Sequence, residues 1–121
     1  MKLAPVKYRI ATAAGPREVS GYAVELPGRL RGIRVCVRRV GGEWCADHYD
    51  SGMSMGGPVM AVTETDPGVI ARVRRWRFDG GSRARAARWI TRYLAHLRRC
   101  GALRAHFETH GLGWCLDEAG L

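Results

Sequence analysis

Residues 82–100, SRARAARWITRYLAHLRRC, hold the clearest structural pattern in the chain. Apolar side chains recur every three or four residues, which predicts an amphipathic helix, and Ser82 suits the N-cap position before it. Gly101 can end this helix. The predicted buried face consists of Ala86, Ala87, Ile90, Tyr93, Leu94 and Leu97. Such a helix needs an apolar surface to pack against, and the first half of the chain has to supply it.

That first half predicts a sheet. Residues 35–40 and 43–48 are rich in β-favouring side chains and flank Gly41-Gly42, a pair suited to a two-residue hairpin turn. The resulting register opposes Val40 to Glu43, Arg38 to Cys45, and Cys36 to Asp47. Because side chains alternate along a strand, the apolar face then consists of Val35, Val37, Trp44 and Ala46.

The flanking segments complete the expected architecture. Residues 7–13 and 17–26 favour two further strands around a Gly-Pro turn, and a short edge strand can lie within 53–62. Shorter helices are expected at 66–76, capped by Asp66, and at 102–111, while 112–121 suits a last strand or an extended tail. We therefore expect one α+β domain over residues 1–121. Its antiparallel sheet of three to five strands, in the N-terminal half, packs against the amphipathic Arg-rich helix and one or two shorter helices in the C-terminal half.

The positive charge of the chain is concentrated. Residues 69–100 hold ten arginines and one acidic residue, Asp79, so this part carries the whole formal net charge of +9. The remaining charges cancel. A local excess of this kind creates a directed field and indicates a surface that meets a negatively charged partner.

Five of these side chains share one face of the main helix. Arg85, Arg88, Arg92, His96 and Arg99 fall within roughly 80° of arc, opposite the apolar face, and we call them the arginine stripe. A solvated helix face usually mixes charges of both signs to gain i,i+4 pairs, and this face holds no acidic residue. The predicted surface for nucleic acid or an acidic partner is the stripe together with Arg72, Arg74, Arg75, Arg77 and Arg83.

The start of the same helix predicts a phosphate site. Arg83 and Arg85 stand in the first turn, where the helix dipole makes positive charge unfavourable. A bound phosphate would offset that cost, because free backbone N–H groups also point outward at a helix start. The residues expected to hold it are Gly80, Gly81, Ser82 and Arg83.

Other chemistries have weaker support in the sequence. His106 and His110 lie four residues apart near Cys100 and Cys115, but this spacing matches no zinc pattern, and no metal or cofactor is expected. The polar run Asp47–Ser51 is typical of a turn, and no nucleophile elbow, phosphate loop or dinucleotide fingerprint occurs. We expect Trp89 and Tyr93 to pack in the core rather than stack on bases.

These features favour a small, non-enzymatic, basic binding protein in the cytoplasm that contacts DNA or RNA phosphates. The alternative is a phage- or mobile-element-encoded protein inhibitor of a bacterial defence complex, of the anti-CRISPR type, which contacts an acidic or nucleic-acid-binding protein. A sheet followed by a helix is loosely similar to the plant AP2-type and phage-integrase arm-binding DNA domains. In those domains the sheet reads the DNA, whereas here the charge lies on the helices. No membrane contact is expected, because no apolar run is long enough to span a bilayer.

Overall fold

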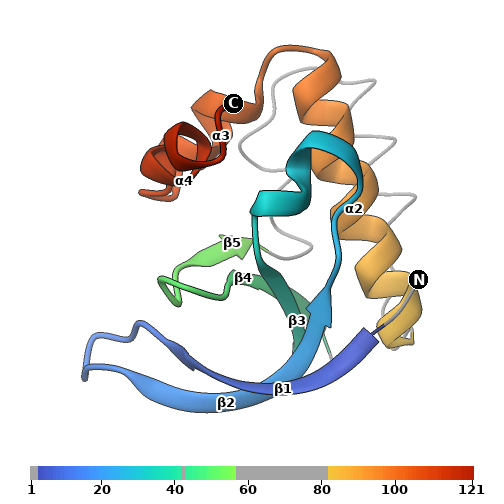
Figure 1. The fold of residues 1–121 in the computed structure, drawn as a ribbon. Helices are drawn as coiled ribbons and strands as arrows, with labels where there is room; N and C mark the ends of the chain where they lie inside the picture. Colours follow the sequence, from blue (N-terminus) through green and yellow to red (C-terminus); the bar gives the residue numbers. More distant parts are fainter. Residues whose placement is uncertain (1–2, 42, 57–81) are drawn as a thin grey trace.

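A five-stranded antiparallel sheet forms the N-terminal part of the protein (Figure 1). The computed structural model describes residues 3–41, 43–56 and 82–121, so the helix expected at 66–76 lies outside the described residues. Strands neighbouring in sequence are also neighbours in the sheet. They are β1 (Leu3–Ile10), β2 (Arg17–Val24), β3 (Val35–Val40), β4 (Glu43–His48) and β5 (Ser54–Gly56). The α+β layout expected from the sequence is confirmed, with helices following the sheet.

The central hairpin of β3 and β4 has the predicted register. Val40 pairs with Glu43, and Cys36 with Asp47. Gly41 has a φ of 57°, the left-handed conformation that a two-residue hairpin turn requires. The pairing confirms the apolar face, which is buried, and consists of Val35, Val37, Trp44 and Ala46.

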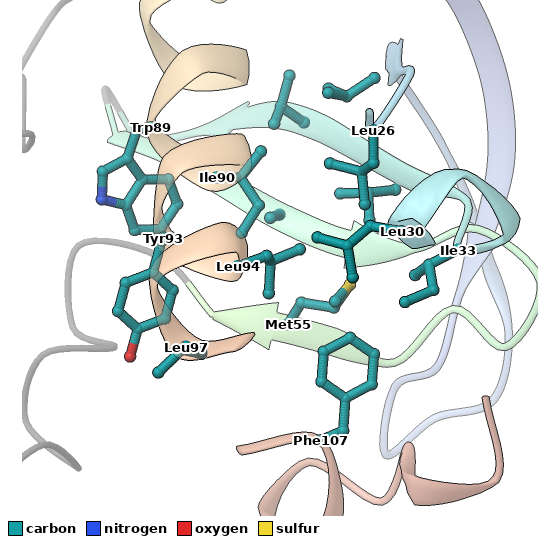
Figure 2. Packing of buried hydrophobic residues seen from close by; sticks show 14 of the residues in the cluster. Leu26, Leu30, Ile33, Met55, Trp89, Ile90, Tyr93, Leu94, Leu97 and Phe107 are labelled. Atoms are coloured by element: carbon teal, nitrogen blue, oxygen red, sulfur yellow. The ribbon is translucent and has the colours of Figure 1, made fainter. Parts of the chain in front are cut away.

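Helix α2 (Arg83–Arg99) packs across this apolar face. Ser82 caps it as expected, because its side chain accepts a hydrogen bond from the backbone N–H of Arg85. Figure 2 shows Ile90 and Leu94 directed toward Leu30 and Met55, whereas Trp89 and Tyr93 lie on the other flank of the helix. All six residues of the predicted buried face are buried: Ala86, Ala87, Ile90, Tyr93, Leu94 and Leu97.

Two short helices, α3 (Leu103–Thr109) and α4 (Gly113–Glu118), follow α2. The first was expected, but the expectation of a strand or extended tail at 112–121 is wrong. Leu112, Cys115 and Leu116 are buried at i, i+3 and i+4, which is helical spacing over a run too short to be distinguished from a strand by periodicity. The sequence also gave no signal for the 3-10 helix η1 (Gly28–Gly32), which inserts Leu30 into the core.

The opposite face of the sheet carries a second, smaller cluster. Tyr8, Ile10 and Cys36 are buried there. The sheet curls around them, since the backbone N–H of Ala11, just after β1, donates to the carbonyl of Gly52, between β4 and β5, over 3.0 Å. This hydrogen bond thus joins the end of β1, at one edge of the sheet, to the segment before β5, at the other edge. Among the described residues, no helix is long and apolar enough to cross a membrane.

Candidate functional site

The outer face of α2 is lined with positive charge. Four residues of the arginine stripe, Arg85, Arg88, Arg92 and Arg99, are exposed, and His96 is half-buried at its edge. The helix contains no acidic residue. Within the described part of the chain, no ion pair involves Arg88, Arg92 or Arg99. The described structure therefore places the stripe where the sequence predicted it, on the side of α2 that faces away from the core.

Arg83, at the start of α2, lies apart from this stripe. Its guanidinium carbon stands 4.8 Å from the centre of the Tyr22 ring, and its Nη1 donates to the Tyr22 hydroxyl over 3.3 Å. Arg83 therefore leans toward the sheet. This contact with a half-buried aromatic ring partly compensates the unfavourable position of a cation in the first turn of a helix.

A hollow of about 1050 Å³ opens between the start of α2 and the sheet. Figure 1 shows the first turn of α2 beside the start of β1. Four of the hollow's lining residues are cationic, and none is acidic. Its lining residues are Pro5, Val6, Lys7, Ser20, Gly21, Tyr22, Arg38, Arg39, Trp44, Ser82, Arg83 and Ala84.

The hollow lies where β2 and β3 separate. The two strands pair from Tyr22 and Val37 to Val24 and Val35. On the other side of Tyr22 and Val37, β2 pairs with β1, and β3 pairs with β4. The ladder between β2 and β3 thus ends at Tyr22 and Val37, next to Gly21 and Arg39 of the hollow's lining.

Arg38 is held in place from the buried side of the sheet. Its Nε donates to Oδ2 of Asp47 over 2.6 Å, and the Tyr8 hydroxyl donates to the same oxygen over 2.7 Å. Asp47 is only 1% exposed, so Arg38 neutralises a buried carboxylate. Burial and the bond to Asp47 strongly raise the pKa of Tyr8, which keeps its hydroxyl a hydrogen-bond donor. The Arg38 guanidinium is therefore fixed through one nitrogen on the face of the sheet that carries Tyr8 and Cys36.

Part of the site predicted from the sequence lies outside the described residues: Arg72, Arg74, Arg75, Arg77, Gly80 and Gly81. Of the predicted phosphate site, Ser82 and Arg83 line the hollow. Lys7, Tyr22 and Arg39 also line the hollow and were not among the site residues predicted from the sequence. One of these positions could have been found from the predicted hairpin register, because that register pairs Arg39 with Trp44 and so places a cation beside an aromatic ring. No sequence pattern within β1 or β2 predicts that Lys7 and Tyr22 line a hollow.

The polar run at the end of β4 contains a buried Cys–His contact. Cys115 Sγ lies 3.4 Å from Nε2 of His48, on the side of the sheet opposite Cys45. Nδ1 of His48 lies 2.8 Å from Oγ of Ser51 and accepts from the backbone N–H of Ser51 over 3.3 Å, so Ser51 orients the ring. Burial raises the pKa of Cys115 to about 11 and lowers that of His48. The contact is thus a neutral thiol beside a neutral imidazole, unlike the thiolate–imidazolium pair of a cysteine nucleophile.

His106 in α3 and His110 directly after it lie apart from the Cys115–His48 contact. His106 and His110 stand 4.7 Å apart between ring centres, and His106 contacts the Tyr93 ring, whereas Cys115 contacts His48. In the part of the chain that the structure describes, no three His, Cys, Asp or Glu side chains are grouped to hold a metal ion. The packing expectation for the aromatic residues is confirmed, since Trp89 and Tyr93 are buried and stack on each other.

No family model matches the chain, and comparisons with curated proteins and with solved structures find no match either. The likeness to plant AP2-type and phage-integrase arm-binding domains therefore stays a similarity in the order of elements. In this structure, cationic side chains lie both on α2 and around the hollow beside the sheet. The chemistry of these two surfaces is the basis for a function.

Proposed function

We propose that this protein binds nucleic acid through the phosphate backbone, with the arginine stripe of α2 as its main contact surface. The observation that carries the proposal is the set Arg88, Arg92 and Arg99, which is exposed and lacks ion pairs among the described residues. From Arg88 to Arg99 the helix rises about 16 Å. One strand of a duplex presents a phosphate roughly every 3.4 Å along its axis, so the stripe can meet several phosphates.

The charge pattern supports a polyanionic partner more than simple solvation. Like charges four residues apart, such as Arg88 and Arg92, destabilise a helix by about 0.2–0.5 kcal/mol per pair. Elsewhere in the described chain exposed arginines do pair with acids, as Arg34 does with Asp50 and Arg104 with Asp117. A phosphate backbone would supply the counter-charges that α2 lacks.

A binding role without catalysis is part of this proposal. Burial raises the pKa of the Cys115 thiol to about 11 and lowers that of His48, so the two groups meet as a neutral thiol and a neutral imidazole. This geometry supports a structural role for the described Cys–His contact. An acidic protein surface could also meet the arginine stripe, and the experiment below separates it from nucleic acid.

Fluorescence anisotropy with labelled oligonucleotides tests the proposal. The variant Arg88→Gln/Arg92→Gln/Arg99→Gln removes three charges from the stripe. The matched control Arg17→Gln/Arg29→Gln/Arg31→Gln removes three charges from exposed arginines on β2 and η1. We expect the stripe variant to lose at least tenfold in affinity for single and double strands, and the control to lose less than threefold. Equal losses of affinity in the two variants would show that only the net charge of the protein matters, which would contradict the proposal. If the wild type bound no oligonucleotide, a protein partner would be favoured.

A further inference from the structure

We propose that the hollow between β2, β3 and the start of α2 binds one unpaired nucleotide, with its base against Tyr22 and its phosphate among the surrounding cations. The proposal rests on the proposed function and deepens it. The arginine stripe would hold a nucleic-acid backbone, whereas the hollow would take a single nucleoside phosphate unit. The shared chemistry is that of a nucleoside 5′-phosphate, whether it is free or part of a strand.

Strands β2 and β3 pack closely at Gly21, at the edge of the hollow. A Cβ atom at Gly21 would stand 2.6 Å from the carbonyl oxygen of Val37 and 3.2 Å from the Tyr8 ring. The strands therefore meet closely at this point and diverge beyond it. The volume of about 1050 Å³ is at the upper end of the roughly 300–1,000 Å³ of small-molecule sites, so a nucleotide fits with part of it exposed.

The cations around the hollow suit a phosphate group. Lys7, Arg39 and Arg83 line the hollow and are exposed. Ammonium and guanidinium groups form charge-assisted hydrogen bonds with phosphate oxygens, and a guanidinium can do so with two N–H groups at once.

The half-buried ring of Tyr22 is the aromatic surface that the hollow offers to a base, with the buried Trp44 ring beside it. Tyr22 and Trp44 stand with their ring centres 6.4 Å apart, and Arg83 lies over the Tyr22 ring. Proteins that bind single strands combine cationic grooves with such aromatic and guanidinium planes. A base in a duplex is stacked on its neighbours and cannot offer its face to Tyr22. The hollow therefore favours an unpaired nucleotide over a paired one.

The test compares a labelled 12-nucleotide single strand, the matching duplex and free adenosine 5′-monophosphate on the full chain. Tyr22→Ala removes the ring, and Tyr22→Phe keeps the ring while removing the hydroxyl that bonds Arg83. We expect Tyr22→Ala to weaken single-strand binding about tenfold or more and duplex binding less than twofold. Tyr22→Phe should stay within threefold of wild type for both. Adenosine 5′-monophosphate should bind saturably, and Tyr22→Ala should abolish that binding.

A second variant covers the case in which Tyr22→Ala fails to fold. Lys7→Ala/Arg39→Ala changes two exposed side chains, and we expect it to weaken binding of adenosine 5′-monophosphate at least fivefold while its binding of unphosphorylated adenosine changes less than twofold. Equal effects of these variants on single strand and duplex, or no effect on either, would overturn the proposal. If duplex binding through the arginine stripe persists in that case, the proposed function stands and only the hollow is excluded. If adenosine 5′-monophosphate binds in the hollow but the stripe variant binds duplex as tightly as the wild type, the hollow stands and the proposed function is excluded.

Discussion

Arg38 and Asp47 form a part-buried ion pair in which the arginine Nε donates to Oδ2 of the carboxylate over 2.6 Å. The pair lies beside the buried cluster under the curled sheet, where the Tyr8 hydroxyl bonds the same carboxylate oxygen. Replacing Arg38 by Met would leave the Asp47 carboxylate buried without a cation. We expect Arg38→Met to lower the free energy of unfolding by about 3–5 kcal/mol, measured by urea denaturation.

Tyr8→Phe is the matched comparison, because it removes one neutral donor to the same oxygen and retains the ion pair. The expected loss is about 1.5–3 kcal/mol, that of one hydrogen bond to a charged group. If Arg38→Met cost no more than Tyr8→Phe, the view that Asp47 depends on Arg38 as its counter-charge would be wrong.

Gly52 closes the curled sheet at a position that excludes any side chain. Its φ is 71°, and a Cβ atom there would stand 2.4 Å from the carbonyl oxygen of Arg9. Both backbone strain and steric overlap therefore oppose Gly52→Ala, and we expect it to cost about 2–5 kcal/mol. Gly41→Ala isolates the strain, since Gly41 has a φ of 57° with open space around it, and should cost about 1–2 kcal/mol. If the two variants lowered the unfolding temperature equally, the view that Gly52 packs too closely against the end of β1 to admit a side chain would be wrong.

The burial of His106 makes the stability of the fold dependent on pH. Burial, together with the nearby His110, lowers the pKa of His106 to about 4 from 6.5. Because the unfolded chain binds this proton more readily, stability is full above about pH 6.5 and falls as the pH drops toward 4. His106→Gln should flatten the slope of unfolding free energy against pH between 4 and 6.5. An unchanged slope in the variant would show that other groups cause the dependence.

The four cysteines should differ in reactivity toward a thiol reagent. Cys100 is exposed, whereas burial raises the pKa of Cys36 and of Cys115 to about 11. At pH 8 we expect Cys100 to react first and Cys36 and Cys115 only as fast as the protein opens. Cys100→Ser should remove the fastest phase. Rapid modification of Cys115 in the native protein would contradict its neutral, buried contact with His48.

The elements that the sequence predicted well are those fixed by local patterns. The helix from Ser82 onward has a long apolar periodicity and a cap, and the central hairpin has a glycine turn between alternating strands. In contrast, α4 is six residues long, so its two buried side chains, Cys115 and Leu116, resemble an apolar strand as much as a helix.

The candidate site was predictable only in its helical half. The arginine stripe follows from the helical repeat of one segment. The hollow depends on contacts between distant segments, such as that of Arg83 with Tyr22, which are 61 residues apart. It also depends on the point at which β2 and β3 separate, and alternation within each strand carries no information about that point.

The salt dependence of oligonucleotide binding tests the central claim most directly. Anisotropy titrations of the wild type and of Arg88→Gln/Arg92→Gln/Arg99→Gln over a series of salt concentrations give the slope of log affinity against log salt. Each phosphate contact contributes about −0.9 on duplex DNA. The account predicts a steep negative slope for the wild type that becomes shallower by about 2–3 in the variant. An equal slope for the two proteins, or no binding at low salt, would contradict it.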